Sequence, residues 1–322
     1  IKNKFNFHIS EPKSVGNITI FGLSPTHKTN ENYLSLSDAL KNNQAQIREV
    51  SGIGSISSLL VRNYSSKKLL LVEGELIVNS YNVKLLQDRV VNTTLVIPPF
   101  KRNYVPVSCV EKFRWNYSSK RSHYISVNED FYFPQARMRK NEDIYYSSRD
   151  YGYKYADQLK VWDIIDDRIE KNKAYSNTSS VNILYERKRI SIEENVKKFD
   201  AKTSDCGIIY GIGSNLIGLD IFNSNAIFRQ FLPKLIRSIS MESFSYPGIS
   251  SCLQKQDAAS FLKLIKQARF EKHNSIGGEG VELRSNQNVF IAQGLFEQKH
   301  GTVIHLSAFM KEKELQPERM IA

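Results

Sequence analysis

The stretch GIIYGIGSNLIGLDIF, residues 207–222, decides the fold class. Two apolar runs flank Gly213, Ser214 and Asn215, whose turn chemistry predicts a tight hairpin between two antiparallel strands. The glycines begin like a dinucleotide-binding fingerprint, but Leu216 stands where the third glycine is required, and a strand follows instead of a helix. The stretch therefore argues against a doubly wound nucleotide-binding sheet.

Outward from this hairpin, the hydrophobic pattern divides the chain into segments with different periods. In chain order these are a strand-rich part (16–111), an irregular excursion rich in Tyr, Ser, Arg and Lys (117–150), a helical part (152–200), a strand-helix-strand part (206–310) and a charged tail (311–322). Strands, helices and strands without regular alternation predict an α+β fold with a mixed, largely antiparallel sheet and a central helical segment.

The chain is basic, since 45 Lys and Arg against 33 Asp and Glu leave a net charge of +12. Such a charge favours an anionic partner, which can be a nucleotide, a nucleic acid or a membrane surface. Charged and polar residues interrupt the apolar runs at 69–78 and 207–222, so we expect no membrane segment. Three scattered cysteines without zinc spacing predict no disulfide framework, no metal site and a cytoplasmic location.

A thiol and a carboxylate are close together in PVSCVE, residues 106–111. The period of a strand puts Cys109 and Glu111 on one face. A neighbouring carboxylate raises the pKa of a thiol, which favours a buried structural pair over an activated nucleophile. Arg114 and Trp115 follow, and this pair suits a nucleotide, with the guanidinium on phosphate and the indole on a base.

Polar side chains also open an apolar strand in QDRVVNTT, residues 87–94. In a regular strand Arg89 and Asn92 face opposite sides, so both serve one pocket only if the strand bulges or begins later. Further on, VIHLS (303–307) places His305 and Ser307 on one face. No carboxylate is adjacent in sequence, so a catalytic triad is not inferred.

One basic cluster is interleaved with aromatic residues, as in proteins that bind single-stranded nucleic acid. It consists of Arg137, Arg139 and Lys140, set among Tyr132, Phe133, Tyr145 and Tyr146. The other basic clusters are spread along the chain, which is typical of a solvated surface.

Five motifs in this order resemble the ARPP family, named for its association with ADP-ribosylglycohydrolases and the rhodanese-phosphatase superfamily. They are RVVNTT (89–94), PVSCVE with Arg114-Trp115 (106–115), Gln158 before Val161-Trp162, GLDIF (218–222) and VIHLSAF (303–309). The similarity extends from about residue 16 to 310, which implies one integrated domain over 1–322. Gly74-Glu75 matches a family pair, whereas KLLQDR (84–89) and Phe113 depart from the family pattern.

The resemblance implies that the gene is associated with genes of NAD and ADP-ribose chemistry in bacteria, in conflict or anti-phage defence systems. We therefore expect the chain to bind, with or without processing, an anionic nucleotide derived from NAD. In this hypothesis Arg89 and Arg114 hold phosphate, Trp115 stacks, Gln87 and Asn92 read polar edges, and Glu75, Glu111 and His305 supply acid or base groups. The alternative is a non-enzymatic module that recognises a protein or nucleic acid through residues 117–150, with Arg137, Arg139 and Lys140 in contact.

Overall fold

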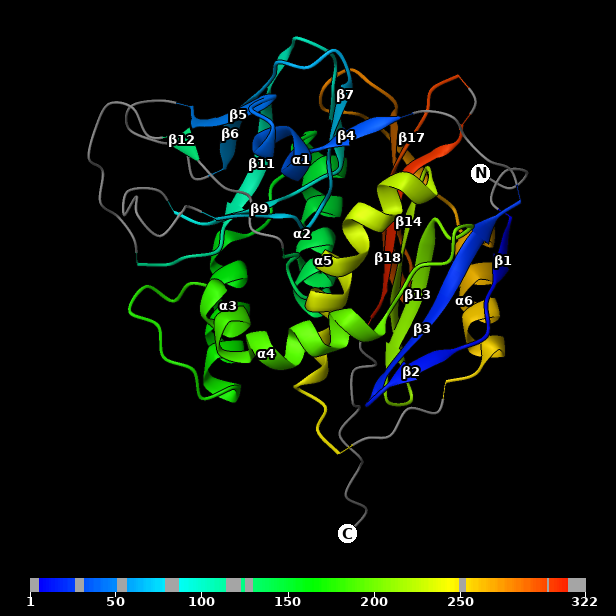
Figure 1. Ribbon diagram of the computed structural model, residues 1–322. Coiled ribbons are helices and arrows are strands. Elements are labelled where there is room, and N and C mark those ends of the chain that lie inside the picture. The colour runs from blue at the N-terminus through cyan, green and yellow to red at the C-terminus, as the bar shows by residue number, and fades with distance from the viewer. Residues whose placement is uncertain are drawn as a thin grey trace.

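Two strand-rich halves lie on either side of the central helices α2 and α5, which gives an α+β fold as predicted (Figure 1). The computed structural model describes residues 6–26, 32–50, 57–78, 87–113, 123–124, 130–248, 253–299 and 301–311. Helix α2 covers Pro134–Tyr151 and α5 covers Asn225–Ser243.

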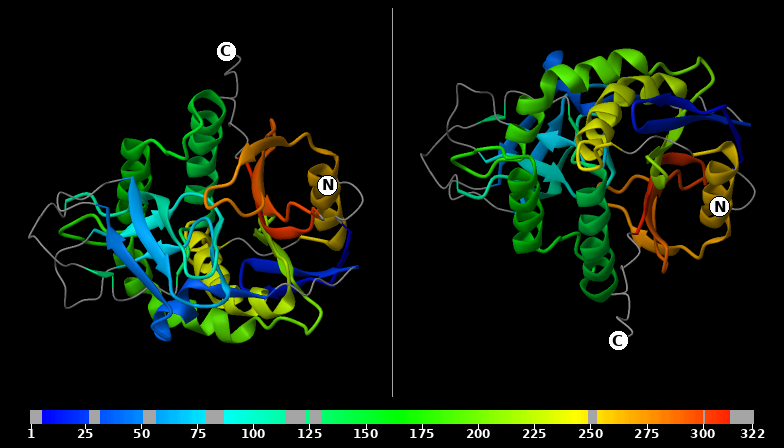
Figure 2. Two further views of the ribbon diagram at one scale, coloured as in Figure 1. Left: turned by 90° about the horizontal axis from the view of Figure 1, so that it is seen from above. Right: turned by 90° about the horizontal axis from the view of Figure 1, so that it is seen from below.

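The larger half is an antiparallel sheet that curves around helix α6, Lys255–Gln267 (Figure 2). Its strands in spatial order are β1 (Phe7–Ile9), β3 (Ile18–Pro25), β13 (Gly207–Ile212), β14 (Asn215–Phe222), β18 (Val303–Met310), β17 (Phe290–Phe296), β16 (Val281–Asn286) and β15 (Glu271–Asn274), with β2 (Lys13–Val15) beside β3. The predicted hairpin is confirmed as β13 and β14, and Gly213 in its turn has φ 59°. Apolar side chains of α5 and α6 bury opposite faces of this sheet.

The smaller half combines two sheets around a separate apolar cluster. One has the order β12 (His123–Tyr124), β5 (Ala45–Glu49), β6 (Ser58–Asn63), β11 (Arg102–Cys109), β9 (Arg89–Val91) and β8 (Leu76–Ile77). The other has β10 (Leu95–Ile97), β7 (Lys68–Leu71) and β4 (Tyr33–Ser35), and its β4 and β7 are parallel. Helix α1 (Leu36–Lys41) begins at Ser35, whose side chain accepts from the N–H of Asp38.

The prediction that residues 117–150 are irregular is wrong for their second half, because α2 begins at Pro134. The helical period is hidden in the sequence because α2 buries polar side chains, among them Arg137, Lys140 and Asn141. The helical part predicted at 152–200 is confirmed as α3 (Gln158–Lys171) and α4 (Asn182–Lys198).

A tight turn at Gly74 connects β7 to β8. Gly74 has φ 90°, and a Cβ atom built on it would lie 2.6 Å from Nε of Arg137. Gly16 also has a positive φ, 59°, but a Cβ atom there would meet no atom within 4 Å. Both glycines therefore have a backbone conformation that would strain another residue, but only at Gly74 would a Cβ atom clash with a neighbouring side chain.

We expect Gly74→Ala to lower the free energy of unfolding by about 2 kcal/mol more than Gly16→Ala, because only the first forces Arg137 to move. Urea unfolding of both variants beside the wild type measures the difference. Equal losses in the two variants would show that the close approach to Arg137 does not matter.

Candidate functional site

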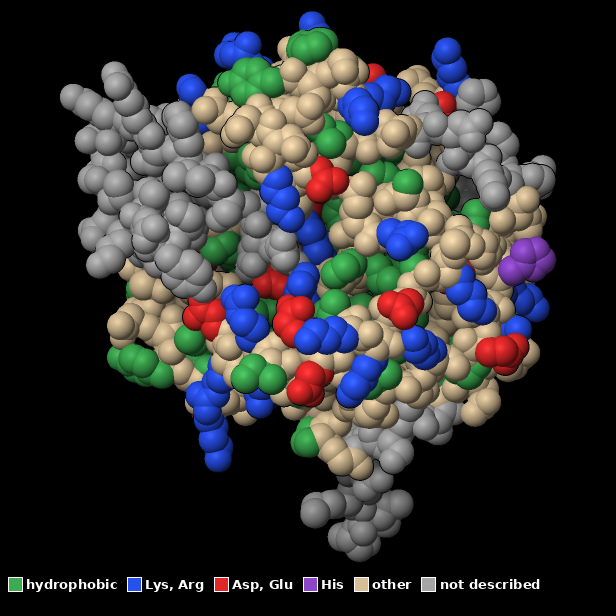
Figure 3. All heavy atoms as spheres, viewed as in Figure 1, with side chains coloured by type: hydrophobic (Ala, Val, Ile, Leu, Met, Phe, Trp, Pro, Cys, Tyr) green, Lys and Arg blue, Asp and Glu red, His purple; other side chains and the backbone are tan. Residues whose placement is uncertain are grey.

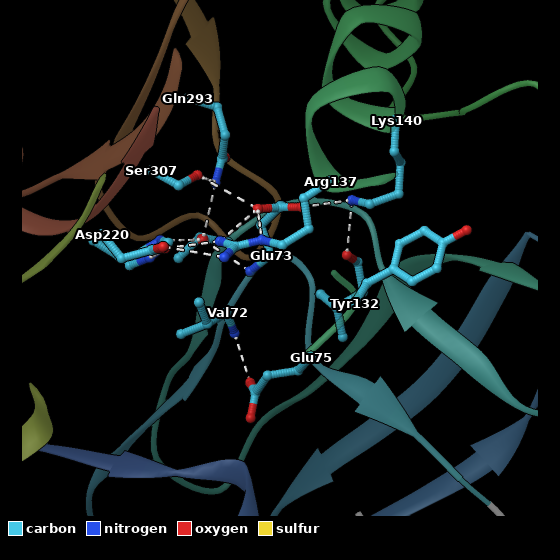
Figure 4. Close-up of polar contacts among 12 residues, drawn as sticks. Val72, Glu73, Glu75, Tyr132, Arg137, Lys140, Asp220, Gln293 and Ser307 are labelled. Atoms are coloured by element: carbon cyan, nitrogen blue, oxygen red, sulfur yellow. Dashed lines mark hydrogen bonds and ion pairs between the residues drawn. The ribbon is translucent and has the colours of Figure 1, made fainter. Parts of the chain in front are cut away.

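A buried group of charged side chains joins the two halves of the molecule (Figure 4). The guanidinium of Arg137 binds the carboxylate of Asp220 in β14 through Nη2 at 2.8 Å and Nη1 at 3.1 Å. It also donates from Nε and Nη2 to Oε2 of Glu73, at 3.1 and 3.0 Å. Nζ of Lys140 lies 2.8 Å from Oε1 of Glu73. We call Glu73, Arg137, Lys140 and Asp220 the ionic core.

The ionic core is closed to solvent, because all four side chains have 0% exposure. Burial raises the pKa of Glu73, but the charges and hydrogen bonds of Arg137 and Lys140 outweigh it and lower that pKa to about 2. Burial also lowers the pKa of Lys140 to about 8, although Glu73 opposes this. The four side chains therefore act as a structural ion cluster.

His305 extends the ionic core. Its Nε2 lies 3.2 Å from Oδ1 of Asp220 and its Nδ1 lies 2.8 Å from Oγ1 of Thr94. Carboxylate, imidazole and hydroxyl follow in the order of a catalytic triad. All three are buried, however, and Oγ1 of Thr94 also accepts from the N–H of Glu73 at 3.1 Å. We therefore assign His305 to the structural cluster, whereas the sequence hypothesis gave it an acid or base role.

Glu75, the other carboxylate of the turn, points away from the ionic core toward α5 (Figure 4). Its Oε2 accepts from the N–H of Val72 at 2.8 Å, and its Oε1 accepts from Nζ of Lys234 at 2.8 Å. The same ammonium donates to Oγ of Ser37 at 2.7 Å. Glu75 thus reaches a different set of partners from Glu73, two residues away.

One turn further along α5, Arg237 holds two more carboxylates. Its Nε lies 3.8 Å from Oδ1 of Asp130 and 2.7 Å from Oε1 of Glu193. We call Glu75, Asp130, Lys234 and Arg237 the α5 site.

The α5 site is mostly buried, because the side chains of Glu75, Lys234, Asp130 and Arg237 are 0%, 6%, 9% and 14% exposed, and it meets solvent at Glu193, which is 39% exposed. Figure 3 shows basic and acidic side chains gathered over this side of the molecule. Burial raises the pKa of Asp130 to about 6, with Arg237 and Arg189 opposing the shift. A carboxyl group with this pKa can both accept and donate a proton near neutral pH.

The structure brings together three of the predicted residues, Gln87, Arg89 and Glu111. Nη1 of Arg89 donates to Oε1 of Gln87 at 3.1 Å, and Nε2 of Gln87 donates to the carbonyl oxygen of Glu111 at 3.4 Å. Nη2 of Arg89 lies 3.5 Å from Oε1 of Glu49. Arg89 is opposite Ile77 in the β8–β9 pair, two residues along the chain from Glu75. We call Glu49, Gln87, Arg89 and Glu111 the Arg89 cluster. It lies beside β8, the strand that follows Glu75 of the α5 site in the chain.

Cys109 is a structural residue in this arrangement. Its thiol donates to the carbonyl oxygen of Glu111 at 2.9 Å, and its backbone N–H and C=O are both bound by the side chain of Gln158, at 2.8 and 2.7 Å. Burial raises the pKa of Cys109, so the thiol stays protonated at neutral pH.

Other predicted residues lie elsewhere. Asn92 donates to the carbonyl oxygen of Lys154 at 3.0 Å, because the chain leaves β9 after Val91. The predicted basic patch is wrong for Arg137 and Lys140, which are buried in the ionic core, whereas Arg139 is exposed. Arg114 and Trp115 lie outside the described residues.

Asp130, Lys234 and Arg237 are not predicted from the sequence. Their local signal is weak, since only the i, i+3 spacing of Lys234 and Arg237 on α5 indicates a shared face. Among the described residues, no group of three or more His, Cys, Asp or Glu side chains could hold a metal ion.

The fold and these contacts define an α+β protein with a closed ionic core and, beside it, a group of buried and partly buried ion pairs on α5. The family model for the ARG and Rhodanese-Phosphatase-superfamily-associated Protein domain, ARPP-1, matches residues 6–309, and the chain belongs to this family. The resemblance found in the sequence is thereby confirmed. No curated protein and no solved structure shows a significant match. No helix in the described part of the chain is long and apolar enough to cross a membrane.

We expect Arg137→Met to lower the free energy of unfolding by about 3–5 kcal/mol, because it removes the guanidinium that two buried carboxylates share. Arg149→Met on the same helix is the matched control, since Arg149 is exposed and pairs only at the surface with Asp150. Urea unfolding at pH 7 compares the variants. Similar midpoints for the two would contradict the importance of the ionic core.

Lowering the pH should reveal how much the ionised Glu73 contributes to the free energy of unfolding. Its pKa falls from 4.5 to about 2 on folding, so the stability that its ionised form supplies is complete above about pH 4.5. It is lost as the pH falls from 4.5 toward 2. We expect Glu73→Gln to make the free energy of unfolding less dependent on pH between 5 and 2.5, as measured by urea unfolding at each pH. An unchanged slope would refute the lowered pKa.

Proposed function

We propose that the chain binds an anionic nucleotide derived from NAD, such as ADP-ribose, at the α5 site and the adjoining Arg89 cluster. The observation that carries this proposal is that Arg89 and Arg237 each hold a partly exposed carboxylate from another element, Glu49 and Glu193, with buried Lys234 beside Arg237 on α5. Guanidinium and ammonium groups bind phosphate with the same hydrogen bonds that they offer a carboxylate. A diphosphate can therefore take the place of Glu49 and Glu193, while Asp130 stays beside Arg237.

The contact between Arg89 and Glu49 is the easiest to replace. It is 3.5 Å long, and the Glu49 side chain is 16% exposed. Charge-assisted pairs with good geometry are shorter, about 2.7–2.9 Å. Glu49 thus acts as an internal competitor for the phosphate, and release of its carboxylate to water costs little.

Asp130 adds chemistry to this binding site. With a pKa of about 6, it is mostly a carboxylate at pH 7. We propose that it takes a proton from a water molecule that attacks the ribose carbon of a glycosidic bond, while the bond to the leaving base or side chain breaks. Arg237 keeps the carboxylate in place.

The family supports the choice of ligand. Its name associates it with ARG proteins, which we interpret as ADP-ribosylglycohydrolases. The net charge of +12 draws anions to the surface. We propose a cytoplasmic role in a bacterial conflict or anti-phage system as the setting, and Arg114, Trp115 and Asn92 keep their place in the hypothesis only as predictions from the sequence.

We expect ADP-ribose or NAD to raise the melting temperature of the wild type, and Arg89→Ala and Arg237→Ala to weaken binding at least about tenfold each, which is about 1.4 kcal/mol. Glu49→Gln should strengthen binding, because it removes the competitor. Calorimetric titration measures the affinities, and Arg102→Ala, an exposed arginine on β11, is the control.

The same panel separates binding from chemistry. Asp130→Asn should keep the affinity for ADP-ribose but abolish release of product from NAD or an ADP-ribosyl substrate, followed by chromatography. A wild type whose melting temperature responds to no adenine nucleotide would refute the proposed function as a whole.

A further inference from the structure

The outer face of the sheet formed by β5, β6 and β11 carries arginines in adjacent strands. The three strands are neighbours in the smaller half (Figure 1), and every second side chain is buried in the apolar cluster beneath them. The side chains between these form two rows across the strands, in which directly opposite Cβ atoms are about 4.5–5.5 Å apart. The first row is Gln46, Arg62 and Arg102, and the second is Arg48, Leu60 and Tyr104. We call these six residues the basic face.

The arginines of the basic face are not neutralised by carboxylates. Glu49 is the one carboxylate on these three strands, and it lies on the other face, where its Oε1 is 3.5 Å from Nη2 of Arg89. Within the described part of the chain, no ion pair joins Arg48, Arg62 or Arg102 to a carboxylate. Three exposed positive charges therefore stand together on one surface of the sheet.

Two of these charges repel each other. Arg62 and Arg102 are directly opposite in the β6–β11 pair, and like charges at such positions destabilise a sheet. The guanidinium of Arg62 lies over the ring of Tyr64, 4.9 Å from its centroid, and the hydroxyl of Tyr64 donates to Oε1 of Gln46 at 3.0 Å. These contacts position Arg62 but add no negative charge. A phosphate between the two guanidinium groups removes the repulsion and accepts hydrogen bonds from both.

Two exposed aromatic residues accompany the arginines. Tyr104, two residues after Arg102 on the same face of β11, is 57% exposed, and Phe100, in the turn before β11, is 66% exposed. Phe100 has φ 57°, which is an uncommon conformation for a residue with a bulky side chain. Buried Asn63 holds this turn, since its Nδ2 donates to the carbonyl oxygen of Pro98 at 3.1 Å. The fold thus keeps a large apolar side chain in water on a strained backbone, which indicates a binding surface.

This combination of charges and rings favours one kind of partner. Arginines spread over three strands offer several phosphates a contact at once, and an exposed ring offers a base a surface on which to stack. Sheet faces bind single-stranded RNA by stacking its bases on aromatic side chains. An acidic peptide or a lipid headgroup would use the arginines but leave the ring without a role.

We propose that the basic face binds single-stranded DNA or RNA, with phosphates on Arg48, Arg62 and Arg102 and a base stacked on Tyr104. Both nucleic acids have the phosphates and the bases that this surface recognises. The inference goes beyond the proposed nucleotide binding, because it uses none of the residues of the α5 site or the Arg89 cluster.

The test measures the fluorescence anisotropy of fluorescein-labelled 12-nucleotide oligo-dT and oligo-rU with the full chain, between about 50 and 200 mM KCl. Each phosphate that a single strand has neutralised makes log affinity fall with log salt by a further slope of about 0.7. We expect Arg62→Ala/Arg102→Ala to reduce the slope by about 1.4. Tyr104→Ala should weaken binding about tenfold with the slope unchanged, because stacking releases no counterions, and Tyr104→Phe should keep the affinity.

Matched controls lie outside the basic face. Tyr175→Ala removes a ring that is 79% exposed, and Arg229→Ala removes an exposed arginine at the start of α5, and both should bind the oligonucleotides as the wild type does. The two sites are told apart by crossed variants. Arg102→Ala should keep the wild-type affinity for ADP-ribose, and Arg89→Ala should keep the wild-type affinity for the oligonucleotides.

Three results of the anisotropy measurements would overturn the proposal: no binding of either oligonucleotide by the wild type, binding that the arginine and tyrosine variants retain in full, or equally tight binding of a labelled 12-residue Glu peptide. The last result would make an acidic protein segment the occupant. Sedimentation with phosphatidylserine vesicles adds a fourth. Vesicle binding that Arg62→Ala/Arg102→Ala loses and that the oligonucleotides do not displace would make a lipid surface the occupant.

Discussion

The guanidinium of Arg137, held between Glu73 and Asp220, is the contact on which the arrangement of this molecule depends. Glu73 belongs to the turn after β7 in the smaller half, Asp220 belongs to β14 in the larger sheet, and Arg137 stands on the helix between them. Removing these charges from water costs several kcal/mol per ion, so the cluster is tolerable only when every ion is paired. That requirement fixes the two halves relative to one another in a way that apolar packing alone does not.

The same contact positions the residues of the α5 site. Glu73 is drawn toward α2, and the turn at Gly74 then sends Glu75 to the opposite side, where it meets Lys234 on α5. The polar run from Arg89 to Thr94 works in a similar way, because each side chain holds a different element. Arg89 pairs with Glu49 of β5, Asn92 binds the Lys154 segment, Thr93 accepts from Arg284 at 3.1 Å, and Thr94 contacts His305. A polar stretch that is unusual at the start of a strand is thus a set of tertiary anchors.

Turn chemistry, hydrophobic period and helix caps predict the helices and strands of this fold better than they predict its sites. The β13–β14 hairpin follows from turn chemistry and period, and Ser35 and Ser224 cap the helices that they precede. Helix α2 was missed because its inward face carries Arg137 and Lys140, which defeats a pattern based on apolar side chains. The neighbourhood of Gln87, Arg89 and Glu111 depends on pairing between β9 and β11. Asp220 and His305 are 85 residues apart, and a side-chain contact at that separation leaves no signal in either local sequence.

The distribution of charge also explains how an anion is drawn to the molecule. Four cations and three carboxylates are buried in and around the ionic core: Arg137, Lys140, Lys154 and Arg284 against Glu73, Asp220 and Glu282. Over all the buried side chains that the structure describes, carboxylates outnumber cations by nine to seven, so none of the net +12 is hidden among them. An anion is therefore drawn toward the surface of the molecule as a whole. Within the α5 site the charges balance, because Lys234 and Arg237 face Glu75 and Asp130. An incoming phosphate must therefore displace a carboxylate such as Glu193 from Arg237, and the overall charge raises the local concentration of the anion that does so.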